Sequence, residues 1–199
     1  DKAWKMKRYK QPWYMGETVI AAIGQGYDLT TPLQVARYTG LLATSKLATP
    51  HIASEVDGKK IAPEMKALEF NPYYLSEIRK GMYEVCNIRG GTAYKTMSKL
   101  PIVVAGKTGT SQVTSIPQST KVRLKEEELA YYHRSHAWIT TYAPYDNPQY
   151  IVTVLVEHGG HGGSTSGPIA ADIYKWLYQK GYFTPEQLAV GEMEHNATR

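Results

Sequence analysis

The sequence is poor in cysteine, which excludes several kinds of site. Cys86 is the only cysteine among 199 residues, so neither an intrachain disulfide nor a cysteine-built zinc site can form. A single cysteine fits the cytoplasm as well as a sparsely bridged secreted protein. The chain also lacks a signal peptide at its start and any apolar run long enough to cross a bilayer. These absences leave the cellular compartment open, since a targeting segment can lie upstream of Asp1.

Phenylalanine is scarce, with 2 residues against 16 tyrosines and 4 tryptophans. Tyrosine has an apolar ring and a polar tip, so it suits half-buried clefts and interfaces. Hydrophobic residues make up 42% of the chain, which is enough for one domain with a core.

The formal net charge of +5 is concentrated at the start of the chain, in Lys2, Lys5, Lys7, Arg8 and Lys10. Such a run can attract nucleic acid, an anionic membrane surface or an acidic polymer, but we interpret it as a solvated face. No stripe of aromatic and basic residues recurs later, so nucleic acid is not an expected partner.

Two helices are predicted by their caps and their apolar spacing. Thr31 is a natural N-cap, Pro32 suits the first helical position and Gln34 completes a capping box, so a helix should run to about Thr44. A second helix should start at Asn71–Pro72 and end at Gly90–Gly91. Its apolar residues at helical spacing are Leu75, Ile78, Met82 and Val85.

The second half of the chain predicts three strands and a last helix. Residues 102–105 form an apolar run that continues into 106–110, and strands at 136–143 and 150–157 are joined by a short turn. We expect these three strands to be adjacent and antiparallel. Residues 159–167 read as a flexible glycine-rich loop. A helix over 168–178 should pack on the sheet through Ile169, Ile173, Trp176 and Leu177.

These elements predict an α+β fold, an antiparallel sheet flanked by helices. The stretch between Thr110 and Ser135 is too charged for a core and long for a simple connection. Disorder and a partly ordered flap remain equal alternatives for it. Within this stretch, Tyr131 and Tyr132 would anchor such a flap or cover the edge of the sheet.

The tetrapeptide Lys107-Thr108-Gly109-Thr110 is the candidate chemical motif. It follows an apolar strand and precedes a hairpin, the setting in which Lys-Thr-Gly serves acyl-transfer enzymes. An enzyme acting on a peptide C-terminus must hold a carboxylate and stabilise an oxyanion. An ammonium, two hydroxyls and a strand-edge N–H can do this, and a glycine lets the substrate backbone approach closely.

A resemblance to the class B penicillin-binding proteins rests on several further segments, in the family's order over most of residues 12–178. The flanking Pro12-Trp13-Tyr14 and Gly16-Glu17-Thr18 resemble the elongation-type branch of that family. The other matching segments are Ile23-Gly24-Gln25-Gly26, Thr31-Pro32-Leu33-Gln34-Val35-Ala36, Gly90-Gly91-Thr92-Ala93, Lys107-Thr108-Gly109-Thr110, His136-Ala137-Trp138 and Tyr142-Ala143-Pro144.

The resemblance implies the penicillin-binding and β-lactamase-like fold, with residues 1–183 as the C-terminal portion of a D,D-transpeptidase domain and 184–199 as a tail. The implied activity cross-links peptidoglycan stem peptides through an acyl-serine intermediate and is inhibited by β-lactams. Lys107 and Thr110 would be catalytic, and Lys107, Thr108, Gly109 and Thr110 would bind substrate. No cofactor or metal is implied.

The implied setting is the periplasm, in a protein anchored to the inner membrane by a segment outside this chain. Implied partners are stem peptides, β-lactams, the upstream portion of the same protein, morphogenesis proteins of the elongation complex and a membrane glycosyltransferase. The chain has no S-x-x-K or S-x-N sequence, so we expect both motifs upstream of Asp1.

Two rival functions remain open at this stage. A β-lactamase shares the architecture but hydrolyses its acyl-enzyme, and a non-catalytic β-lactam sensor or degenerate scaffold would lack S-x-x-K in its full sequence.

A geometric problem also remains, because Lys107 and Thr110 point to opposite faces of a regular strand. Both serve one cleft only if the strand twists or bulges, or if Thr110 acts through its backbone N–H.

The histidines are not expected to bind a metal. His158 and His161 lie near Glu157 but in a glycine-rich segment that does not fix ligand geometry, so loop polarity is the preferred interpretation. We interpret His136 as structural. Gly24-Gln25-Gly26 lacks the G-K-[ST] of a phosphate-binding loop, so we assign that segment to packing.

Overall fold

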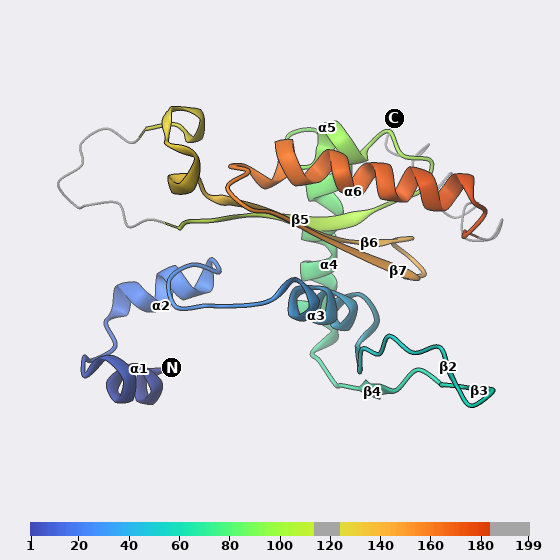
Figure 1. The fold of residues 1–199 in the computed structure, drawn as a ribbon, viewed down its shortest axis with the longest axis horizontal. Coiled ribbons are helices and arrows are strands. Elements are labelled where there is room, and N and C mark those ends of the chain that lie inside the picture. Colours follow the sequence, from blue (N-terminus) through green and yellow to red (C-terminus); the bar gives the residue numbers. More distant parts are fainter. Residues whose placement is uncertain (114–123, 184–199) are drawn as a thin grey trace. The chain divides into compact units, whose positions relative to one another are not determined.

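The computed structural model describes residues 1–113 and 124–183 (Figure 1). The chain forms two compact units, residues 1–30 and residues 31–199. The predicted tail at 184–199 and the middle of the predicted flap lie outside the described residues.

The first unit contains α1 (Lys2–Tyr9) and α2 (Met15–Ala22). Lys5 departs from the predicted solvated basic face, because it is 1% exposed. Its ammonium forms an ion pair with Glu17, donates to the Pro12 carbonyl at 2.8 Å and lies 4.7 Å from the centre of the Tyr14 ring. The hydrogen bond from Lys5 lowers the pKa of the Glu17 carboxyl below its ordinary value. The ion pair therefore joins the two helices of this unit.

The second unit begins with α3 (Pro32–Thr44), as predicted. Thr31 Oγ1 accepts from the Gln34 N–H at 3.2 Å, and Gln34 Oε1 accepts from the Thr31 N–H at 2.8 Å, so the capping box is confirmed. Helix α4 (Pro72–Asn87) has the predicted cap at Asn71 but ends before Gly90–Gly91. Of the apolar residues at helical spacing, Leu75 and Met82 are buried, whereas Ile78 is 46% exposed. Cys86 is buried as well.

Between α3 and α4 lie two small sheets that the apolar pattern did not predict. Strand β1 (Lys46–Ala48) pairs with β4 (Met65–Ala67), and β2 (Glu55–Val56) pairs with β3 (Lys59–Lys60). Asp57 and Gly58 join β2 to β3 with φ values of 50° and 74°. That is the two-residue Asp-Gly turn that favours a tight hairpin.

The main sheet has the order β5-β6-β7, and both pairings are antiparallel. Its strands are β5 (Ala105–Ser111), β6 (His136–Ala143) and β7 (Tyr150–Val156). The predicted arrangement is confirmed, except that residues 102–104 are buried without belonging to the strand. Their carbonyls bond elsewhere: the Asn87 side chain donates to the Val104 oxygen, and the Tyr145 N–H donates to the Val103 oxygen.

Helix α6 (Gly162–Gln179) covers one face of the sheet (Figure 1). The prediction was wrong in two respects. The helix begins inside the predicted glycine loop, and Ile169, Ile173 and Trp176 are at least 38% exposed. The buried side instead presents small residues and one tyrosine, namely Gly162, Ser166, Gly167, Ala170, Ala171 and Tyr174. Small side chains let the helix axis approach the sheet closely, so size rather than hydrophobicity selected the buried face.

Two hydrophobic clusters hold the second unit together. The larger lies between the sheet and α6 and includes Cys86, Ile139 and Tyr174. Burial raises the pKa of the Cys86 thiol to about 12, so this cysteine stays protonated and unreactive at neutral pH. The smaller cluster includes Ala43, Met82 and Tyr142. The sheet is therefore packed on both faces, which fixes the position of β5.

Candidate active site

Strand β5 carries Lys107 to Thr110 at an edge of the main sheet in the described part of the chain. An edge strand leaves alternate N–H and C=O groups directed away from its neighbour, where an extended ligand can meet them. The register with β6 is continuous from Ala105–Tyr142 to Ser111–His136. The strand therefore has no bulge at Gly109, and bulging does not solve the problem of opposite faces.

Lys107 shares its face with Thr140 and Thr153, because these three residues are register partners across the sheet. Its side chain is exposed, and Nζ donates to the Thr108 carbonyl oxygen at 2.7 Å. Among the described residues, Lys107 forms no ion pair. The ammonium thus lies along its own strand, within reach of an incoming anion.

Thr108 and Thr110 lie on the other face, the one that α6 covers, and both are partly buried. Thr108 Oγ1 is 2.7 Å from Thr92 Oγ1, a partner that the sequence did not assign. Two hydroxyls carry two hydrogens, and their mutual hydrogen bond uses one. One hydrogen of the pair is therefore left to donate to a ligand.

The glycines at the start of α6 lie directly against the motif. A Cβ on Gly162 would lie 2.0 Å from the Trp138 carbonyl oxygen and 2.6 Å from that of Gly109. A Cβ on Gly163 would lie 2.2 Å from the backbone carbonyl oxygen of Thr92. Only glycine fits these contacts, so the residues read as a flexible loop are a packed helix start.

Three threonine hydroxyls form a hydrogen-bonded row on the same face of the sheet as Lys107. Thr140 Oγ1 is 2.8 Å from Thr39 Oγ1 of α3 and 2.8 Å from Thr153 Oγ1 of β7. Thr39 is fully buried and donates to the Val35 carbonyl at 2.8 Å. The row joins α3 to the sheet at the cross-strand partner of Lys107, which restricts movement of the strand there.

The described part of the predicted flap is ordered by a carboxylate. It contains two short 3₁₀ helices, η1 (Glu126–Glu128) and η2 (Tyr131–His133). Glu126 accepts from both the N–H and the hydroxyl of Ser135, each at 2.8 Å. The Tyr131 and Tyr132 rings pack on His158 with centroids 5.1 Å and 5.6 Å away. These contacts favour the anchored flap over disorder for residues 124–135.

The histidines have structural partners. His136 Nδ1 accepts from the His158 N–H at 2.9 Å, and His158 Nδ1 lies 3.1 Å from the Arg134 oxygen. This agrees with the structural interpretation of His136. No group of three or more potential metal ligands occurs in residues 1–113 and 124–183. Over the same residues, no helix is long and apolar enough to cross a membrane.

Comparisons with known proteins place these features in one family. Residues 5–175 match the penicillin binding protein transpeptidase domain. The chain is 39% identical over 179 residues to the peptidoglycan D,D-transpeptidase MrdA of Haemophilus influenzae, covering 85% of this chain and 27% of the relative. It thus spans between a quarter and a third of that protein.

Two solved structures extend the comparison. The complex between PBP2 and MreC from Helicobacter pylori superposes with a TM-score of 0.76 at 45% identity, covering 92% of this chain and 31% of the other. A peptidoglycan synthase complex, described as coordinating polymerization and crosslinking, gives a TM-score of 0.69 at 26% identity over 93% of this chain and 29% of the other.

Proposed function

Because this chain belongs to the penicillin-binding protein transpeptidase family, we propose that it forms one side of a D,D-transpeptidase active site. The whole protein would cross-link peptidoglycan stem peptides through an acyl-serine intermediate and would be acylated by β-lactams. The observation that carries this proposal is the Lys-Thr-Gly-Thr strand at a sheet edge, with an exposed lysine that has no ion pair among the described residues.

The proposed roles follow from the chemistry of each group. The Lys107 ammonium would leave the Thr108 carbonyl, bind the substrate carboxylate and tune the serine–lysine pair of the upstream portion. The Thr108 and Thr110 hydroxyls would add hydrogen bonds to that carboxylate from the other face, since the Lys107 side chain is long enough to bring its ammonium to the Thr108 carbonyl oxygen of the strand itself. The Thr110 N–H would be one oxyanion donor, with the catalytic serine supplying the other. Acting through its backbone, Thr110 serves the same edge of the strand although its side chain lies on the opposite face from Lys107.

The nucleophile should lie outside the 199 residues, and a labelling experiment tests this. A fluorescent penicillin should label the complete protein at one serine and leave the isolated chain unlabelled, since the chain contains no S-x-x-K. Covalent labelling of the isolated chain at stoichiometric yield would show that it carries its own nucleophile. Peptide mapping of the labelled complete protein identifies the serine.

The same experiment separates the rival functions. A transpeptidase holds its penicilloyl group far longer than a β-lactamase, which releases it by hydrolysis. A complete sequence without S-x-x-K, together with no covalent labelling, would instead support a non-catalytic module.

Thr92 offers a finer test of the carboxylate site. Thr92→Val keeps the side-chain shape but removes the hydroxyl that pairs with Thr108. Loss of one neutral hydrogen bond costs about 0.5–1.5 kcal/mol. At about 1.4 kcal/mol per decade, the acylation rate constant of the complete protein should fall roughly two- to tenfold. Thr44→Val removes an exposed hydroxyl at the end of α3 and is the matched control. A wild-type rate for Thr92→Val would exclude this role.

We also propose partners and a cellular location for the protein, using its relatives as a guide. The Helicobacter pylori protein was solved with MreC, so a morphogenesis protein of that kind is the expected partner here. The synthase complex supports a second partner, a membrane enzyme that polymerises glycan. For the location we propose a periplasmic domain of an inner-membrane protein whose anchor lies outside this chain, and the MrdA relatives support an extracytoplasmic domain.

A further inference from the structure

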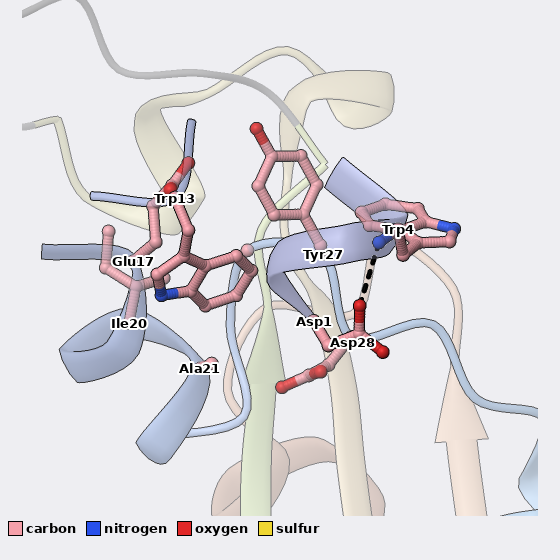
Figure 2. Close-up of a pocket in the computed structure, with 9 residues that line it drawn as sticks. Asp1, Trp4, Trp13, Glu17, Ile20, Ala21, Tyr27 and Asp28 are labelled. Carbon is pink, nitrogen blue, oxygen red and sulfur yellow. Dashed lines mark hydrogen bonds between the residues drawn. The ribbon is translucent and has the colours of Figure 1, made fainter. Parts of the chain in front are cut away.

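The first unit contains a cavity of about 300 Å³ between its two helices and the loop after α2. Three aromatic rings line it: Trp4 of α1, Trp13 of the link between the helices, and Tyr27 of the loop (Figure 2). The Tyr27 ring centre lies 5.4 Å from that of Trp4 and 6.4 Å from that of Trp13. Residues from three separate segments thus place aromatic surface around one space.

These rings are held in place by contacts outside the cavity. Trp13 Nε1 donates to Thr18 Oγ1 at 2.9 Å, which fixes the plane of the indole. The Tyr27 ring packs on Tyr9 at 5.4 Å, and the buried Lys5 ammonium lies 5.7 Å from its centre. Because each ring has its own support, the lining is formed before any ligand arrives.

The side-chain charges that line the cavity are all negative. They belong to Asp1, Glu17 and Asp28, and neither lysine nor arginine contributes to the lining. The ion pair with Lys5 neutralises Glu17, and one oxygen of Asp1 accepts from the Trp4 N–H at 2.8 Å. Within the described residues, no cation pairs with Asp28. An anion would therefore be repelled, while the aromatic faces and the Asp28 carboxylate both attract a cation.

We propose that this aromatic cavity binds an alkylammonium group. The faces of indole and phenol rings attract an organic cation, and a nearby carboxylate adds a charge-assisted hydrogen bond to each ammonium N–H that it meets. The volume suits a short alkyl chain that ends in an ammonium, such as a lysine side chain or a free amine. This proposal does not rest on the transpeptidase function, since it uses only residues of the first unit.

Fluorine NMR of the complete protein, labelled with 5-fluorotryptophan, tests the proposal. The Trp4 and Trp13 signals are assigned with Trp4→Phe and Trp13→Phe. Titration with n-butylammonium at constant chloride should shift both signals with saturation, whereas butyrate should shift neither. Asp28→Asn should raise the Kd of n-butylammonium about tenfold, because it removes the unpaired charge and keeps the shape of the side chain. Asp57→Asn, at an exposed turn, is the matched control and should leave the Kd unchanged.

Three outcomes overturn the proposal: no saturable shift, equal shifts with n-butanol, or an unchanged Kd in Asp28→Asn. An equal effect of n-butanol would identify a simple apolar cavity. A lysine peptide and free n-butylammonium share the proposed chemistry, so their Kd values show which source the cavity prefers. Labelling of the same samples by fluorescent penicillin reports on the transpeptidase function separately.

Discussion

Lys107→Ala should leave the complete protein folded and lower its second-order rate of acylation by penicillin about ten- to a hundredfold or more. The lost interaction is a charge-assisted hydrogen bond to the ligand carboxylate, worth roughly 1.5–3 kcal/mol, at about 1.4 kcal/mol per decade of rate. Lys107 is exposed, and its ammonium donates a hydrogen bond to the carbonyl of the adjacent residue. A surface charge of this kind contributes little to stability, so the melting temperature should stay near that of the wild type.

Lys107→Arg should recover only part of the rate. The guanidinium keeps the charge but is bulkier and places its donors in a planar fork. Acylation rate and thermal melt are measured for both variants beside the wild type. A wild-type rate in Lys107→Ala would mean that Lys107 is an ordinary solvated lysine and that the site assignment is wrong.

Gly162→Ala should destabilise the complete protein strongly and impair acylation. Its Cβ would lie 2.0 Å from the Trp138 carbonyl oxygen and 2.6 Å from that of Gly109, so the start of α6 or strand β5 must move. Overpacking of this severity costs about 3 kcal/mol or more. In a domain of about 150–250 residues that corresponds to a fall in melting temperature of roughly 6–12 °C, and the fall is smaller in the larger complete domain.

Gly81→Ala is the control for Gly162→Ala. Gly81 also lies within a helix, α4, but a Cβ there would meet nothing within 4 Å. This substitution should stabilise the protein by about 0.5–1 kcal/mol, because alanine loses less backbone entropy in a helix. If Gly162→Ala melted like Gly81→Ala, the close approach of α6 to the motif would be wrong.

The parts of the fold that local sequence signals determine were predicted well. The capping box of Thr31 and Gln34 and the strand at 136–143 are properties of neighbouring residues, and the structure reproduces their bounds. Helix α6 shows where such signals fail. Its isoleucines have the spacing of a buried face, yet the close approach of helix to sheet selects glycine, alanine and serine there. The distance between α6 and the sheet depends on how the whole unit packs, so the spacing of apolar residues along the helix does not reveal it.

The candidate site was predicted to a similar extent. Lys107 to Thr110 form an edge strand, as their apolar approach and glycine suggested. The Thr92–Thr108 contact joins a loop to a strand, so spacing along the chain does not reveal it. The sequence shows that residues 162 and 163 are glycines. It does not show that they lie against the Lys107–Thr110 motif, because that contact follows from where α6 packs.

No strand among the described residues pairs with the second edge of β5, and this edge also bears on how the isolated chain behaves in solution. A strand edge with directed N–H and C=O groups is a template for pairing with the same edge of a second copy, which leads to self-association. Lysine on an edge strand opposes such pairing, because two copies would bring ammonium groups together. In this view the charge of Lys107 protects the edge while no ligand occupies it. Lys107→Ala samples should therefore be checked for dimers by light scattering before any loss of rate is assigned to the chemistry.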